Sequence, residues 1–246
     1  MSRRQFRLYR QKRSLLKRVS LIVIALASFV LCYLIIREFL IKSIVIGSES
    51  MEPVFHIGDR LLAAPLAFGA EVPFVNRRTR QISQPERGDL VVIRPPYYST
   101  TPIRRILSPF AEVFTLQRVS LETPLGLNTE DSLLVRRVIG VPGDTIRIED
   151  HEALIRASGS TAFVRENEIG SNRYEIVKDS LPAEWDASLP FNGDIAEFQL
   201  EDEYFLMSDN RGITNDSRYW GAVGSDAFVG KILLRYWPLR SFGVPR

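Results

Sequence analysis

The sequence predicts a mostly β protein, in which one N-terminal transmembrane helix precedes a domain of twisted antiparallel sheets. Three observations lead to this prediction. Residues 19–36 form a single uncharged apolar run, whereas later apolar runs are short and stop at glycine or proline, as strands do. Outside the long run, no segment repeats apolar residues with the 3.6-residue period of a helix over three turns. Helices therefore contribute little to the predicted domain.

The apolar run is long enough to cross a bilayer. As a helix, residues 19–36 would extend about 27 Å at ~1.5 Å per residue, close to the thickness of the hydrocarbon core. A cleaved signal peptide has a shorter apolar region that ends at small residues, whereas Arg37-Glu38-Phe39-Leu40 follows here. We therefore expect a retained transmembrane helix over residues 19–41, a basic arm over 1–18 and one domain over 43–246.

The basic arm predicts the orientation in the membrane. Residues 1–18 carry eight cationic side chains and no acidic one, and such segments remain in the cytoplasm. We expect a single-pass protein of the inner (cytoplasmic) membrane with an extracytoplasmic, periplasmic domain. The rest of the chain, without those eight cations, contains 24 of the 32 basic residues and all 29 acidic residues. The arm is therefore expected to contact anionic lipid, and the positive total charge does not indicate nucleic-acid binding.

The cysteine and histidine content excludes two kinds of site. Cys32 is the single cysteine and lies inside the predicted membrane helix, so no intrachain disulfide is possible and the domain must depend on its apolar core. Two histidines without a cysteine cluster give no zinc-ligand pattern. We therefore expect no metal and no other cofactor.

Strands are predicted wherever a short apolar run lies between turn residues. Gly88 precedes one such run and Pro95-Pro96 ends it, while Val141-Pro142-Gly143-Asp144 is typical of a turn and Pro238 closes the last run. The predicted strands are residues 44–46, 89–94, 133–139, 145–148, 153–155, 203–207 and 228–237. Two segments of mixed polarity, around 97–131 and 158–200, are expected to be inserted connections or hairpins, with one short helix at 103–116.

Ser50 is the candidate nucleophile. It lies in Ile46-Gly47-Ser48-Glu49-Ser50-Met51-Glu52-Pro53, where glycine and proline favour a tight turn directly after a predicted strand. A serine hydroxyl becomes nucleophilic when a neighbouring base takes its proton. Histidine is the usual base, but His56 and His151 are both expected at ordinary strand or surface positions.

A desolvated lysine is the alternative base. Beyond the membrane region the chain offers Lys178 and Lys231. We expect Lys231 to be solvated or ion-paired within its strand, and Lys178 lies in the second inserted segment.

Four motifs behind the apolar run resemble, in the same order, those of the bacterial type I signal peptidases, which belong to the Ser–Lys serine peptidase clan. They are Ser48-x-Ser50-Met51-x-Pro53, Arg87-Gly88-Asp89-Leu90-Val91-Val92, Arg137-Val138-Ile139-Gly140-Val141-Pro142-Gly143-Asp144, and Ser208-Asp209-Asn210-Arg211 with Asp216-Ser217-Arg218-Tyr219-Trp220-Gly221. The resemblance covers most of the chain and implies a signal-peptidase-like catalytic domain. It also implies a membrane-anchored serine endopeptidase that removes signal peptides from exported preproteins, binding them extended along a strand edge.

The resemblance gives individual residues a role. Ser50 would be the acylating nucleophile, and its backbone N–H together with the Ser48 hydroxyl would form the oxyanion hole. Asp216 and Arg218 would form an ion pair beneath the site, and Thr214 would supply a hydroxyl that orients the base. The same loop would be braced by Asp209, Asn210 and Arg211.

The chain departs from the family pattern at the general base. Arg136 takes the position of the catalytic lysine, and a guanidinium, whose ordinary pKa lies far above neutral pH, does not give up its proton in practice. Ser208 also replaces a glycine. Two interpretations remain open: a signal peptidase that uses another base, or an inactive or impaired paralogue that binds leader peptides or a partner peptidase.

A third interpretation, a self-cleaving repressor of the same clan, is disfavoured by the membrane helix and by the lack of a DNA-binding helix pair. For either of the first two, the expected partners are signal peptides, the lipid bilayer and the secretion machinery, and we expect no nucleic acid.

Overall fold

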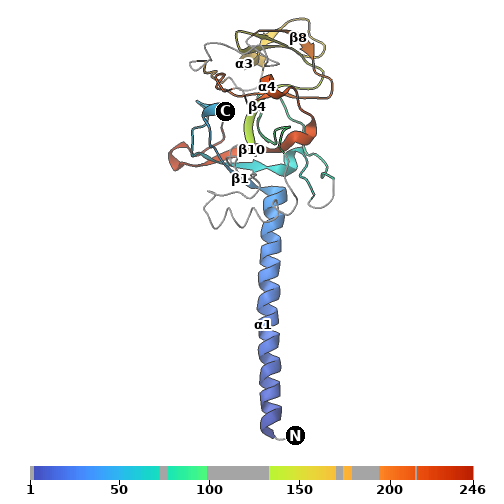
Figure 1. Cartoon of the computed structure of the whole chain (residues 1–246), viewed down its shortest axis with the longest axis vertical. Coiled ribbons are helices and arrows are strands. Elements are labelled where there is room, and N and C mark those ends of the chain that lie inside the picture. Colours follow the sequence, from blue (N-terminus) through green and yellow to red (C-terminus); the bar gives the residue numbers. More distant parts are fainter. Residues whose placement is uncertain are drawn as a thin grey trace.

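A long helix carries a domain built from two β-sheets (Figure 1). The computed structural model describes residues 3–72, 77–98, 133–169, 174–178, 194–213 and 215–245. For residues 3–16 and for Arg37 it describes the backbone alone. The predicted fold class, antiparallel sheets behind an N-terminal apolar helix, is confirmed for this part of the chain.

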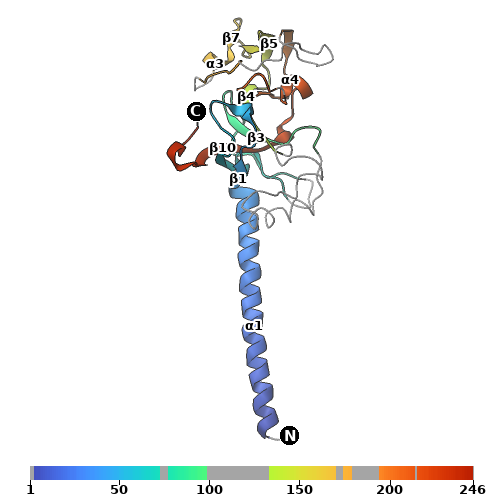
Figure 2. The ribbon, with the colours of Figure 1, turned by 60° about the vertical axis from the view of Figure 1, so that its left-hand side comes forward.

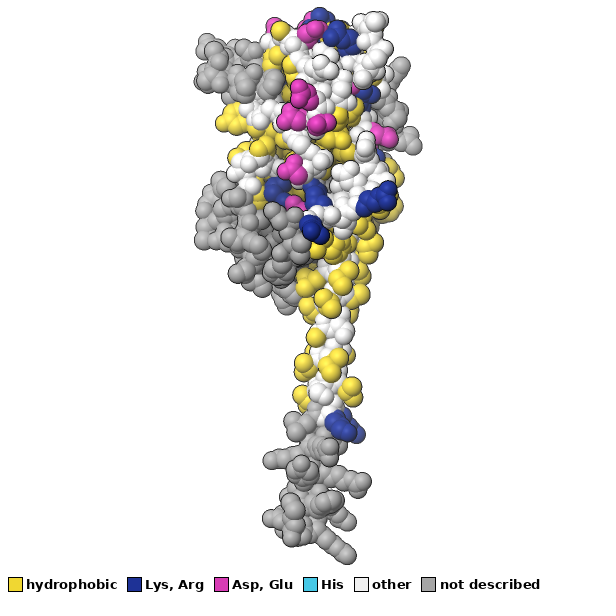
Figure 3. Space-filling view, turned by 90° about the vertical axis from the view of Figure 1, so that its right-hand side faces the viewer, with side chains coloured by type: hydrophobic (Ala, Val, Ile, Leu, Met, Phe, Trp, Pro, Cys, Tyr) yellow, Lys and Arg dark blue, Asp and Glu magenta, His cyan; other side chains and the backbone are white. Residues whose placement is uncertain are grey.

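The helix α1 spans Arg3–Ile35 and continues as a π-helical turn, η1 (Ile36–Leu40). Its apolar part, Lys17–Leu40, is long and apolar enough to cross a membrane and is not buried against the domain. Figure 3 shows apolar side chains along this part of the rod. The backbone is already helical at Arg3, so the basic arm continues the helix at its N-terminal end.

The first sheet has six strands, and all its pairings are antiparallel. In spatial order they are β1 (Lys42–Val45), β2 (Arg60–Ala64), β10 (Phe228–Trp237), β3 (Leu90–Ile93), β4 (Leu134–Gly140) and β9 (Phe205–Met207). Strand β4 is buried along its whole length. Strand β2 was not predicted, although its burial alternates as that of a half-buried strand does, with Leu61 and Ala63 facing the core.

The second sheet has four antiparallel strands and lies at the end of the molecule away from α1 (Figure 2). Its order is β7 (Val164–Arg165), β6 (Glu152–Arg156), β5 (Thr145–Glu149) and β8 (Ile195–Gln199). Short helices flank the sheets: η2 (Glu49–Met51), η3 (Pro65–Phe68), α3 (Glu166–Ile169), α4 (Ser217–Trp220), η5 (Ser225–Ala227) and η6 (Leu239–Ser241).

The second expected insertion, 158–200, contains β7, α3 and β8. Most of the first, with the helix predicted at 103–116, lies outside the described residues, as do 170–173 and 179–193 of the second.

Apolar packing fixes the turn that contains Ser50. Met51 and Phe55 are fully buried in the cluster beneath β1 and β2. On the other side, Ile139, Phe205 and Met207 join β4 and β9 to the second sheet. Strand β4 therefore runs through the junction of the two sheets, and polar side chains on it are held in a dry, rigid environment.

Candidate active site around Ser50

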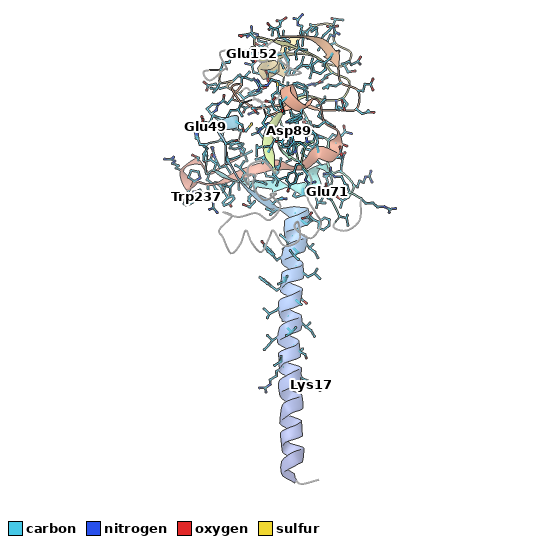
Figure 4. All side chains as sticks on the ribbon, viewed as in Figure 1. Lys17, Glu49, Glu71, Asp89, Glu152 and Trp237 are labelled. Atoms are coloured by element: carbon cyan, nitrogen blue, oxygen red, sulfur yellow. The ribbon has the colours of Figure 1, made fainter. Side chains whose placement is uncertain are left out.

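Ser50 lies in the one-turn helix η2 and is 3% exposed. Its hydroxyl Oγ is 3.0 Å from the Oγ of Ser48, so the two hydroxyls lie side by side. Asn210 fixes the backbone from the opposite loop: its N–H donates to the Ser50 carbonyl at 3.0 Å and its Nδ2 to the Glu49 carbonyl at 3.3 Å. Figure 4 marks this turn by Glu49, on the domain and well removed from Lys17 in the helix.

Arg136 extends from β4 directly to the Ser50 hydroxyl. Its Nη1 donates to Ser50 Oγ at 2.9 Å and also to the Val135 carbonyl. Its Nε and Nη2 both donate to the carbonyl of Asn215, at 2.9 and 2.7 Å. All three nitrogens are thus donors, and Ser50 Oγ can only accept from this side chain.

Burial lowers the pKa of Arg136 but leaves its side chain protonated. Desolvation lowers the pKa of Arg136 to about 10, against the opposing charge of Asp216. The guanidinium therefore remains protonated at neutral pH. A protonated donor cannot take the serine proton, so this geometry does not activate Ser50 as a nucleophile.

Asp216 and Arg218 form the buried ion pair that the sequence predicted. Nε and Nη2 of Arg218 donate to the two carboxylate oxygens at 2.9 and 2.7 Å. Asp216 also accepts from the backbone N–H of Ser208 at 2.9 Å. Burial alone would raise the pKa of Asp216, but the charge and hydrogen bonds of Arg218 hold it below the ordinary value.

Arg218 secures the loop before α4 as well. Its Nη1 and Nη2 donate to the carbonyls of Arg211 and Ile213, at 2.9 and 3.0 Å. The pair with Asp216 therefore holds two loops together, one of which follows β9 and contributes Asn210.

The Ser208–Arg211 loop is braced by two further buried pairs. Asp209 accepts two hydrogen bonds from Arg137 of β4, at 2.8 and 2.6 Å. Arg211 pairs with Glu166 of α3 at 2.5 Å, and Glu166 in turn accepts from the hydroxyl of Tyr174 at 2.7 Å. Arg137 also lies 3.9 Å over the ring of Tyr174. These contacts tie the loop to β4 and to the second inserted segment.

The buried charges of this region do not balance within the described residues. Four guanidiniums, those of Arg136, Arg137, Arg211 and Arg218, are each at most 2% exposed. Three buried carboxylates, those of Asp209, Glu166 and Asp216, accompany them. Tyr174 adds no charge, since burial and the neighbouring Glu166 raise its pKa well above the ordinary value. The surplus positive charge lies on Arg136, whose acceptors are neutral oxygens.

The other candidate bases lie elsewhere. Lys178 forms ion pairs with Asp150 and Glu152, at 2.8 and 3.0 Å. Lys231 pairs with Asp89 at 2.7 Å, as its strand position suggested. His56 is exposed and its Nδ1 lies 3.2 Å from Glu52 Oε1.

Two further candidate residues are His151 and Thr214. His151 lies in the turn between β5 and β6, in the left-handed region with φ of 63°. Thr214, the expected orienting hydroxyl, lies outside the described residues.

Three functional contacts were not predicted. Asn215 accepts the hydrogen bonds of Arg136 through its backbone carbonyl. The type of residue at position 215 does not indicate this contact. Glu166 and Tyr174 come from the second inserted segment, whose mixed polarity gave no periodic signal. A buried glutamate among polar residues cannot be distinguished by sequence from a solvated one.

Comparison with known proteins decides the family. A family model described as signal peptidase, peptidase S26, matches residues 15–237. The chain belongs to this family. The resemblance drawn from the four motifs is therefore confirmed, and it extends across both sheets.

Curated relatives agree with this assignment to the signal peptidase family. Signal peptidase I of Pseudomonas fluorescens is 26% identical over 237 residues, covering 83% of this chain and 68% of the relative. That of Pseudomonas aeruginosa is 27% identical over 219 residues, covering 85% and 64%. Signal peptidase I T of Bacillus subtilis is 26% identical over 218 residues, covering 87% and 83%. The chain spans about two thirds of the length of the two Pseudomonas relatives.

A solved structure is also similar to the chain. A crystal structure of a signal peptidase I from Enterococcus faecalis is 20% identical and covers 61% of this chain and 98% of its own, with a TM-score of 0.30. Because that score is low, the assignment rests on the sequence matches. Those matches support a signal-peptidase-like function for this chain.

Proposed function

We propose that the protein is a membrane-anchored member of the signal peptidase family that binds signal peptides and does not cleave them efficiently. The observation that carries this proposal is the hydrogen bond from Arg136 Nη1 to Ser50 Oγ at 2.9 Å. A protonated guanidinium occupies the place of a proton acceptor, so the hydroxyl has no base. In this proposal the protein is an impaired paralogue that holds leader peptides or a partner peptidase.

The lysine content supports the same conclusion. The chain has five lysines. Lys178 and Lys231 are committed to ion pairs, Lys17 lies in α1, and Lys42 lines a hollow at the base of the domain. Lys12 belongs to the basic arm, for which the backbone alone is described. None of the four lysines with described side chains is hydrogen-bonded to Ser50 in the described part of the molecule.

The rest of the site favours peptide binding. The Ser48 and Ser50 hydroxyls lie together, and three buried ion pairs hold the surrounding loops. Such a site keeps a fixed shape for a bound backbone even without a base. The N-terminal arm would stay in the cytoplasm, and the domain would meet signal peptides, and the secretion machinery that delivers them, on the far side of the membrane.

Binding and cleavage can be measured together. The full-length protein in detergent should bind a labelled signal peptide, and cleavage of a preprotein should stay at background. Ser50→Ala should leave the affinity for the signal peptide within about threefold, because the substitution removes only one neutral hydroxyl group. Cleavage by the unmodified protein that Ser50→Ala abolishes would overturn the proposal, and so would absence of any peptide binding.

The surplus positive charge predicts a preference among peptides. A peptide that ends at the cleavage position places a carboxylate beside Ser50 Oγ, where the Arg136 guanidinium lies. We expect such a free acid to bind about 10-fold more tightly than the same peptide with a C-terminal amide, because charge-assisted hydrogen bonds in a dry site exceed neutral ones. Calorimetry with the two peptides measures this ratio, and Arg136→Gln should reduce it to about 1.

A slow serine endopeptidase is the second candidate, favoured by the lowered pKa of Arg136. With a pKa of about 10, about 1 guanidinium in 100 is neutral at pH 8. The base must be deprotonated, so any cleavage that depends on Ser50 should rise about tenfold per pH unit up to about pH 10. Rates between about pH 7 and 9, corrected by Ser50→Ala, provide the measurement. A flat or falling rate excludes Arg136 as the base.

A further inference from the structure

A chain of hydrogen bonds connects the surface of the domain to the Ser50 hydroxyl. At its inner end, Arg136 donates to Ser50 Oγ and, through Nε and Nη2, to the main-chain carbonyl of Asn215. At its outer end lies Tyr97, which follows β3 in the sequence and is 51% exposed. Asn215 is the residue through which the exposed tyrosine reaches the buried guanidinium.

The side chain of Asn215 is held at both ends of its amide group. The Tyr97 hydroxyl donates to Asn215 Oδ1 at 3.0 Å and accepts from Asn215 Nδ2 at 2.8 Å. The indole Nε1 of Trp220, in α4, donates to the same Oδ1 at 3.2 Å. Two aromatic residues thus fix the side chain of Asn215, while its main-chain carbonyl accepts from Arg136.

These side-chain contacts matter because Asn215 lies in a loop. It directly precedes Asp216, the N-terminal cap of the short helix α4, and belongs to no helix or strand itself. The backbone direction of a loop asparagine depends on the hydrogen bonds that its side chain makes. The contacts with Tyr97 and Trp220 therefore help to direct the Asn215 carbonyl toward β4, and Figures 1 and 2 both show α4 close to β4.

The electrostatics agree with a short path from Tyr97 to Arg136. Burial lowers the pKa of Arg136 to about 10, whereas Asp216 and, after it, Tyr97 act in the opposite direction. Tyr97 therefore lies close enough for a charge on its hydroxyl to affect the guanidinium.

We propose that Tyr97 is a positioning residue for Arg136. Its hydroxyl orients Asn215, and the carbonyl of Asn215 then holds the guanidinium against Ser50 Oγ. For peptide binding this inference rests on the proposed function, because the guanidinium held there is the group expected to distinguish a free acid from an amide. The orientation of Arg136 itself does not depend on that function.

Tyr97→Phe tests the inference by removing the hydroxyl and keeping the ring. The preference for the free-acid peptide should fall about threefold, because a guanidinium free to turn away from Ser50 Oγ loses part of its charge-assisted hydrogen bond to the carboxylate. The unfolding midpoint should stay within about 2 °C, since one exposed hydrogen bond contributes little to stability. As a matched control, Tyr219→Phe changes an equally exposed tyrosine of α4 whose hydroxyl is not bonded to Asn215 within the described residues, and it should alter neither quantity.

Asn215→Ala tests the same step from the other side, because it removes the amide and keeps the main-chain carbonyl. Its free-acid preference should fall at least as far as that of Tyr97→Phe. The double variant Tyr97→Phe, Asn215→Ala should lose no more than Asn215→Ala alone, since the two residues act in series. Additive losses would mean that Tyr97 acts on the peptide directly, and would overturn the inference.

A measurement without peptide separates this inference from the proposed function. Solvent exchange of the Arg136 Nε–H reports its hydrogen bond to Asn215. It can be followed by NMR of the arginine-labelled full-length protein in detergent, with the signal assigned by its absence in Arg136→Gln. Tyr97→Phe should accelerate this exchange about fivefold, as expected when one hydrogen bond is weakened. Such an acceleration in a protein that binds no peptide would contradict the proposed function alone, whereas an unchanged exchange rate would overturn the role of Tyr97.

Discussion

Arg136→Lys is expected to give this protein a signal-peptide cleavage rate at least about 100-fold above that of the unmodified chain. A positioned general base contributes about 10²–10⁴-fold to such reactions, and the geometry of the chain lacks that one component. Arg136 already extends from β4 to within 2.9 Å of Ser50 Oγ. A lysine at the same position on the same strand would start from the same Cα and point along the same path.

The environment of Arg136 suits a lysine base. Desolvation there lowers even the pKa of a guanidinium, to about 10. The same burial would lower the pKa of a lysine ammonium from its ordinary value toward neutral pH. The cleavage rate of Arg136→Lys should therefore rise with pH through the lysine pKa and then become constant, since the base acts when deprotonated.

The controls separate a restored base from a general change in the site. Arg136→Gln removes the guanidinium without supplying a base and should remain inactive. Ser50→Ala combined with Arg136→Lys should also be inactive, because the nucleophile is missing. The measurement is cleavage of a preprotein in detergent or lipid. An Arg136→Lys protein that folds, binds peptide and still does not cleave would show that the base is not what limits activity.

The sequence predicted the site better than it predicted what holds the site together. Ser48, Ser50 and the Asp216–Arg218 pair were expected from short motifs, and the structure brings them into one region. A motif of neighbouring residues can be recognised in the sequence because a tight turn or a local ion pair brings together residues that are close in the chain. Arg136 was expected at the base position and indeed reaches Ser50 across 86 residues of sequence.

The contacts that were missed come from distant or backbone groups. Glu166 meets Arg211 across 45 residues, from a segment with no apolar period to predict its position. The carbonyl of Asn215 belongs to the backbone, and every residue has one. Strand β2 was missed because Arg60–Ala64 is short and four of its five residues are apolar, so the alternating burial of Leu61 and Ala63 does not appear as an alternation of residue types. Tertiary contacts decide all three cases, and they are not encoded in local residue patterns.

Breaking the buried Arg137–Asp209 pair is expected to cause a large loss of stability. Asp209→Asn preserves the shape of the side chain and removes its charge, leaving Arg137, 1% exposed, without a carboxylate partner. Removal of one partner of a buried pair costs about 3–5 kcal/mol. At about 2–4 °C per kcal/mol for a domain of this size, the unfolding midpoint should fall by about 6–20 °C.

Asp150→Asn provides a matched control, because the same chemical change is made in a pair that water surrounds. The Asp150 side chain is 83% exposed where it meets Lys178, and such exposed pairs contribute little. Its unfolding midpoint should match that of the unmodified protein. The double variant Arg137→Met, Asp209→Leu replaces both buried charges by apolar groups and should recover most of the loss, since no unpaired charge remains. A midpoint for Asp209→Asn equal to that of Asp150→Asn would mean that the Asp209 carboxylate does not stabilise the loop that carries Asn210.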